Sequence, residues 1–106
     1  MRQIRITKQE RENVLQKYGC TCAYCGNAIT NDTMYLDAIP DSINPSCRRC
    51  KRRKQGKTIE QFRAHIKAEH HRLQYKNSKY SLCKDFGMVK DVTNEVTFNF
   101  EKYKTQ

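Results

Sequence analysis

Two Cys-x-x-Cys pairs constrain the fold of this chain more than any other feature of its sequence. Cys22 pairs with Cys25 and Cys47 with Cys50, and 21 residues lie between the two pairs. Such pairs are typical of zinc sites in which four thiolates hold the ion at about 2.3 Å and leave no open position for catalysis. We therefore predict that these four cysteines bind one structural zinc ion.

Disulfides are the alternative use for the six cysteines of this chain. A disulfide framework is typical of small secreted proteins. The opening residues MRQIRIT lack the apolar core of a signal peptide, so we expect a cytoplasmic protein with reduced cysteines. Cys20 lacks the two-residue spacing to Cys25 that Cys22 has. We expect Cys83, the remaining cysteine, to be a small buried hydrophobe.

The balance of charge indicates the class of partner. Lys and Arg number 21 against 11 Asp and Glu, which gives a formal net charge of +10. A charge of this size favours a polyanion through counterion release, and nucleic acid is the first candidate. No apolar run approaches the roughly 20 residues of a membrane-spanning helix, so we expect no membrane partner.

The positive charge is densest at the second cysteine pair. Seven of the ten residues from 48 to 57 are basic and none is acidic, which favours phosphate contact over a merely solvated face. A nuclear-localisation signal has the same composition and stays open as an alternative. The predicted nucleic-acid-binding residues are Arg48, Arg49, Lys51, Arg52, Arg53, Lys54 and Lys57.

Local patterns predict the elements before the second cysteine pair. Thr7 and Glu10 form a capping box in front of a helix over residues 8–18. Apolar residues alternate over residues 33–39, which predicts a strand ending at Pro40. A further helix is expected to begin near the second cysteine pair and to run through Lys54.

The second half of the chain predicts support for this module. Thr58 and Gln61 form another capping box, and an apolar stripe follows it to about residue 74, which predicts a helix with a buried face. Residues 78–86 are expected to form a short helix stopped at Gly87. The alternation after Gly87, with Val96, Phe98 and Phe100 on one face, predicts a C-terminal hairpin. The members of the stripe are Ile59, Phe62, Ile66 and Leu73.

With these features in place, the chain resembles the HNH endonuclease (ββα-metal) family, in particular its small phage-type members. The similarity spans nearly the whole chain, and its most specific part is the two cysteine pairs with Asp, Pro and Asn between them. The matching segments are Cys22-Ala-Tyr-Cys25-Gly26, Asp37-x-Ile39-Pro40, Asn44-Pro45-x-Cys47-x-x-Cys50, Lys54 and TIEQFR.

The resemblance implies an α+β fold: a small zinc-stapled ββα-metal domain with flanking helices and a C-terminal hairpin. We predict a single domain over residues 1–106. Its core module would span residues 19–56, its helical support residues 57–86 and its hairpin residues 87–103.

The resemblance also implies a chemistry, namely metal-assisted hydrolysis of a phosphodiester with a histidine as general base. Carried over by position, Asp37 is the acidic metal ligand and Asn44 the residue that orients the loop. Ala38 stands where the family has its general-base histidine, and Lys51 where it has a His or Asn ligand. Both departures weaken catalysis, so we expect poor binding of a catalytic Mg, Mn or Ni ion.

These residues lead to a first hypothesis of a nucleic-acid-binding protein, with double-stranded DNA as partner and nuclease activity weak or lost. The second is an active HNH endonuclease or nickase, or one inactivated by an engineered change at Ala38. Lys51 argues for natural loss, because a designer would need only one change. The third is a phage protein-binding factor, such as an inhibitor of a host defence nuclease, with a protein or ribonucleoprotein as partner.

Overall fold

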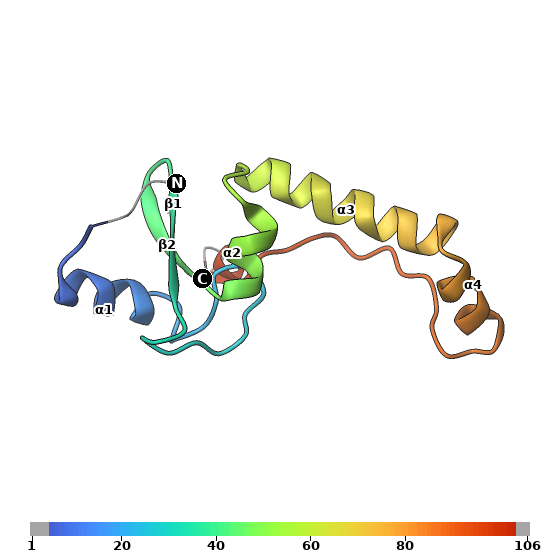
Figure 1. The fold of residues 1–106 in the computed structure, drawn as a ribbon, viewed down its shortest axis with the longest axis horizontal. Helices are drawn as coiled ribbons and strands as arrows, with labels where there is room; N and C mark the ends of the chain where they lie inside the picture. Colours follow the sequence, from blue (N-terminus) through green and yellow to red (C-terminus); the bar gives the residue numbers. More distant parts are fainter. Residues whose placement is uncertain (1–4, 104–106) are drawn as a thin grey trace. The chain divides into compact units, whose positions relative to one another are not determined.

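The computed structural model describes residues 5–103, which form two compact units. The first unit comprises residues 5–56 and 97–103, and the second comprises Lys57–Val96. Figure 1 shows the chain, with labels on the strands β1 and β2 and on the helices α1, α2, α3 and α4. The division falls where the core module was predicted to end, except that the chain returns to the first unit at residue 97. The single-domain organisation stays a prediction.

The first unit begins with α1, Lys8–Gln16. The predicted capping box is present: the Glu10 amide donates to Thr7 Oγ1 at 3.0 Å, and the Thr7 amide donates to Glu10 Oε1 at 3.1 Å. These bonds satisfy amides that have no partner within the helix. Gly19 lies just beyond α1 at φ +65°, a conformation that glycine adopts without strain. The helix buries Leu15 in the core of the unit.

A two-stranded antiparallel sheet follows, made of β1, Tyr35–Ile39, and β2, Ser42–Ser46. Its register places Asp37 opposite Asn44. α2, Arg48–Lys54, comes directly after β2, so the order within this module is strand, strand, helix. The strand predicted over residues 33–39 is confirmed from residue 35, and the predicted helix through Lys54 is confirmed.

The core of the first unit joins residues that are distant in sequence. Tyr24 packs edge-on against both Phe98 and Phe100, with ring centroids 5.6 and 6.0 Å apart. Phe98 is 2% exposed and Phe100 is 5% exposed. The C-terminal segment therefore completes the core that begins around the first cysteine pair.

The predicted C-terminal hairpin over residues 87–103 is wrong. Residues 89–98 have no regular secondary structure, and α5, Asn99–Tyr103, is a helix. The alternation of Phe98 and Phe100 reflects burial rather than strand pairing. The Phe98 amide donates to the Glu101 side chain, and the amides of Asn99 and Phe100 donate to the carbonyls of Tyr24 and Ala23. No partner strand is needed, because other groups satisfy these amides.

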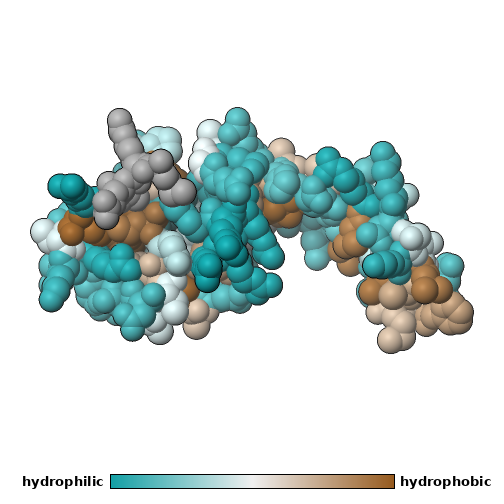
Figure 2. All heavy atoms as spheres, viewed as in Figure 1, coloured by the Kyte–Doolittle hydropathy of each residue, from teal (hydrophilic) through white to brown (hydrophobic). Residues whose placement is uncertain are grey.

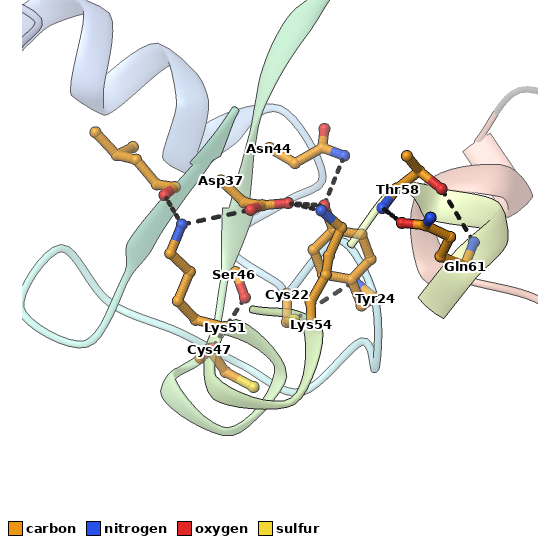
Figure 3. A network of polar contacts seen from close by, with 11 residues as sticks. Cys22, Tyr24, Asp37, Asn44, Ser46, Cys47, Lys51, Lys54, Thr58 and Gln61 are labelled. Atoms are coloured by element: carbon orange, nitrogen blue, oxygen red, sulfur yellow. Dashed lines mark hydrogen bonds and ion pairs between the residues drawn. The ribbon is translucent and has the colours of Figure 1, made fainter. Parts of the chain in front are cut away.

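The second unit contains α3, Ile59–Lys76, and α4, Ser78–Asp85. The capping box of Thr58 and Gln61 that begins α3 is confirmed (Figure 3). α4 ends before Gly87, as predicted, and Gly87 lies at φ +74°.

The predicted core stripe of α3 is largely wrong. Among residues 57–96, all of which are described, only Phe62 is buried, and Leu73 is 43% exposed. Cys83 is exposed rather than buried, so the expectation for this cysteine is wrong as well. Periodicity identified the helix correctly, but a unit of this size has too little chain to cover the whole stripe.

Candidate metal centre and adjoining basic helix

The four predicted cysteine ligands come together in the first unit. The sulfur atoms of Cys22, Cys25, Cys47 and Cys50 all lie within 4.8 Å of one another. The Sγ atoms of Cys25 and Cys47 are 3.7 Å apart. Sulfurs at the corners of a tetrahedron with metal bonds of about 2.3 Å are about 3.8 Å apart, so this donor set fits a zinc ion. A candidate site for a structural metal ion is therefore present.

The backbone around the first cysteine pair is arranged to hold a thiolate. The Cys22 amide donates to the Asn27 carbonyl at 2.8 Å, and the Gly26 amide donates back to the Cys22 carbonyl at 3.1 Å. Gly26 lies at φ +81°, so this tight turn favours glycine. The Tyr24 amide points at Cys22 Sγ, 3.4 Å away. Such amide contacts stabilise sulfur in its negative form.

α2 supplies the second pair from its first turn. Cys47 is the N-cap of the helix, and its sulfur accepts from the Cys50 amide at 3.5 Å. Because a helix N-terminus carries unpaired amides and a positive dipole, a thiolate is stabilised there. The chain thus places the second pair of ligands by starting a helix at Cys47.

The thiols differ in acidity before any metal binds. A hydrogen bond from Cys50 lowers the pKa of Cys22 well below its ordinary value. The same hydrogen bond, followed by burial, raises the pKa of Cys50, and burial raises the pKa of Cys25. Cys22 is therefore the most acidic of these three thiols, and Cys25 and Cys50 are the thiols whose protons a bound metal would displace.

The C-terminal segment, residues 97–103, forms hydrogen bonds with the backbone of the first Cys-x-x-Cys pair. The Phe100 amide donates to the Ala23 carbonyl at 2.7 Å, and the Asn99 amide donates to the Tyr24 carbonyl at 3.1 Å. The side-chain amide of Asn99 also reaches the Cys22 carbonyl at 3.0 Å. Sequence patterns missed this role, because nothing in the spacing of residues 97–103 ties them to cysteines more than 70 positions earlier.

α2 divides the predicted nucleic-acid-binding residues between two faces. Lys54 is 3% exposed, and Lys51 is half-buried. Lys57 is half-buried and belongs to the second unit. Lys54 therefore does not belong to the exposed basic surface on which the prediction placed it. The residues exposed on the outer face of the helix are Arg48, Arg49, Arg52 and Arg53. We call these four residues the arginine face.

Lys51 and Lys54, the less exposed lysines of α2, bind the carboxylate of Asp37, which is itself 4% exposed (Figure 3). Lys54 Nζ lies 3.1 Å from Asp37 Oδ2, and Lys51 Nζ lies 3.4 Å from Oδ1. Lys51 also donates to the Leu36 carbonyl at 2.8 Å, and the Tyr24 hydroxyl donates to Asp37 Oδ2. Both carboxylate oxygens thus face cationic groups of the protein.

Asn44 and Tyr24 extend this polar network into the core. Asn44 is fully buried; its Nδ2 donates to the Tyr24 hydroxyl at 3.5 Å, and its Oδ1 accepts from the Tyr18 hydroxyl at 3.3 Å. Burial, followed by the hydrogen bond to Asp37, raises the pKa of Tyr24, so this hydroxyl keeps its proton. Asn44 thereby links β2 to the turn after α1 and to the first cysteine pair. Sequence patterns gave no sign that Tyr18 and Tyr24 would join this network.

Ala38 is separated from the other predicted catalytic positions. The structure brings Asp37, Asn44 and Lys51 into one network, whereas Ala38 is exposed and pairs with Ile43 in the sheet. Successive residues of a strand point to opposite faces, so Ala38 faces away from the Asp37 carboxylate. All three histidines of the chain lie on α3 in the second unit, and the sequence of the first unit contains none.

Among residues 5–103, every helix is too short or too polar to cross a lipid bilayer. Comparisons with protein-family models, with curated proteins and with solved structures found no match.

Proposed function

We propose that this chain is a zinc-stabilised, HNH-like nucleic-acid-binding protein that grips its partner without cutting it. The observation that carries the proposal is the occupation of Asp37 by Lys51 and Lys54. In the proposed kinship, Asp37 is the residue that would hold a catalytic divalent cation. Two ammonium groups of the protein take the place of that cation.

The charges around Asp37 oppose a divalent ion. One carboxylate faces two ammonium groups, so the cluster has a net positive charge before any metal arrives. A Mg²⁺ or Mn²⁺ ion would have to displace both lysines, and breaking a buried ion pair costs roughly 3–5 kcal/mol. An ammonium group cannot lower the pKa of a bound water as a metal does. The centre is therefore suited to electrostatic attraction and not to hydrolysis.

The missing base removes a second part of the reaction. Ala38 carries no group that can accept a proton, and general-base assistance typically contributes a factor of about 10² to 10⁴ in rate. The sequence of the first unit contains no histidine elsewhere that could substitute for it. Loss of the base and neutralisation of the metal ligand act together against cleavage.

In this proposal the arginine face binds the nucleic acid. Its four arginines are exposed residues of a helix that is anchored by Cys50 to the cysteine cluster and by Lys54 to Asp37. Rigid anchoring reduces the ordering that binding requires, and guanidinium groups bind phosphate oxygens in pairs of hydrogen bonds. The zinc ion stabilises the start of this helix in the proposal, and the helix presents the arginines to a phosphate backbone.

Salt-dependent binding tests the proposal. Zinc-loaded protein should bind a fluorescent DNA duplex in an anisotropy titration, and the affinity should fall steeply with added salt. If the four arginines each displace a counterion, replacing all of them by Gln should reduce the slope of log K against log salt by about 3 to 4.

A matched control keeps the net charge equal. Replacing Lys8, Lys76, Lys79 and Lys90 by Gln removes the same four charges from exposed positions outside α2. This control should retain most of the binding. Equal losses of DNA affinity in the two variants would show that binding depends only on net charge and would contradict a role for the arginine face.

A further inference from the structure

The second unit exposes an apolar patch around α4. Figure 2 shows hydrophobic side chains gathering at the end of the unit that α4 forms. The exposed fractions of the six residues in this patch range from 37% to 77%. They are Leu73, Leu82, Phe86, Met88, Val89 and Val92, which we call the tip patch.

Polar contacts hold the backbone of this region in place without covering the patch. The Met88 amide donates to the Cys83 carbonyl at 2.8 Å, and the Val92 amide donates to Gln74 Oε1 at 2.8 Å. Asp91 accepts from the Tyr80 hydroxyl at 2.8 Å. The segment after α4 is thus tied back to both helices of the unit, and its apolar side chains still face outward.

α4 contacts α3 but buries little apolar surface there. It has eight residues, and none of them is buried. Isolated helices shorter than about 12 to 15 residues are marginal in water, and most helical stability in proteins comes from packing an apolar face. A surface that covers Leu82 and Phe86 would supply the packing that α4 lacks.

The area of the patch matches what self-association needs. Its six side chains expose on the order of 600 Å², which is the upper end for a patch on a monomer and approaches the roughly 800 Å² that each partner buries in a standard interface. A twofold dimer joins identical surfaces, so apolar meets apolar across the whole contact.

Charge complementarity also favours a second copy over a polyanion. Residues 78–92 carry three lysines and two aspartates, whereas residues 48–57 carry seven basic residues and no acid. In a chain with a net charge of +10, the nearly balanced tip repels its own copy less than the basic segment of residues 48–57 does. We propose that the tip patch is the contact surface of a homodimer. This proposal is independent of nucleic-acid binding, and its test contains no nucleic acid.

Light scattering coupled to size exclusion tests the dimer with the full-length, zinc-loaded chain. At about 100 μM, where an association of micromolar affinity is nearly saturated, the mass should be twice the 12.6 kDa of one chain. Phe86→Ser should raise the dissociation constant at least tenfold, because it removes the most exposed large side chain of the patch. Tyr35→Ser, at an exposed aromatic in the first unit, is the matched control and should leave the mass unchanged.

Zinc content and far-UV circular dichroism establish that each variant is folded. Met88→Ser is the second variant if Phe86→Ser fails to fold, and the same loss of dimer is expected. A wild-type chain that stays monomeric at this concentration overturns the proposal and leaves the patch to a partner of different sequence. A dimer that survives substitutions at Phe86 and Met88 overturns it as well.

Discussion

The cysteine cluster and the Asp37 cluster are neighbours in the chain but differ in what they can bind. Cys50 and Lys51 are adjacent on α2, and one belongs to a set of four converging thiols while the other covers a carboxylate. The first set has donors whose protons a metal displaces. The second already has its cations, supplied by lysine side chains. Adjacent residues of α2 therefore serve two clusters of different chemistry, one able to hold a metal ion and one already neutralised by lysines.

Removing one cysteine ligand should have the largest effect and tests the first half of the comparison. Cys50→Ser leaves three thiols, and structural zinc in small domains contributes apparent binding free energies of about 10–16 kcal/mol. We expect loss of stoichiometric zinc and unfolding of the first unit, measured by metal analysis and circular dichroism. Cys83→Ser, at the exposed cysteine outside the cluster, should retain both metal and fold.

Removing the Asp37 carboxylate tests the second half of the comparison, the lysine–aspartate cluster. Asp37→Leu leaves Lys54 buried and unpaired, so we expect a loss of roughly 3–5 kcal/mol in the free energy of unfolding with zinc retained. Chemical denaturation measures it, and Asp41→Leu, at an exposed carboxylate, is the control. Adding Lys54→Met to Asp37→Leu should recover much of the loss. A stable single variant would contradict the buried ion pair.

The pH dependence of zinc affinity tests the protonation of the cysteine cluster. Because the pKa values of Cys25 and Cys50 are raised, both thiols carry protons near neutral pH that zinc must displace, so affinity should rise with pH. The pKa of Cys22 is lowered, so this group contributes little until the solution is acid. The slope of log K against pH should therefore stay below four near pH 7, as measured by competition with a chelator. A slope of four would show that Cys22 is protonated as well.

Placing a histidine at position 38, where the HNH family that the sequence resembles has its general base, should have the smallest effect. Ala38 is exposed, so Ala38→His should change the free energy of unfolding by no more than about 0.5 kcal/mol. The new imidazole would stand on the sheet face opposite to the Asp37 carboxylate, and that carboxylate would still be held by two lysines. We expect no plasmid cleavage by this variant, with an active nuclease as the assay control. Cleavage that also requires Asp37 would favour an engineered loss of the histidine.

Sequence motifs that act over a few residues predicted the features that depend on neighbouring residues alone. The cysteine spacing predicted the four-cysteine cluster that could hold a metal ion, and the capping residues Thr7 and Thr58 predicted two helix starts, because each signal acts within a few residues. The burial of Lys54 against Asp37 could not be predicted, because a basic run does not indicate which of its lysines pairs with a buried carboxylate. The alternation at Phe98 suggested a strand because burial against Tyr24 has the same period.

Cleavage under permissive conditions tests the central claim most directly. Zinc-loaded wild-type protein and Asp37→Ala are incubated with plasmid DNA and Mg²⁺, Mn²⁺ or Ni²⁺, while binding is followed on the same DNA. The account predicts binding that weakens with salt and no turnover with any of the three ions. Metal-dependent turnover by the wild type that Asp37→Ala abolishes would contradict it.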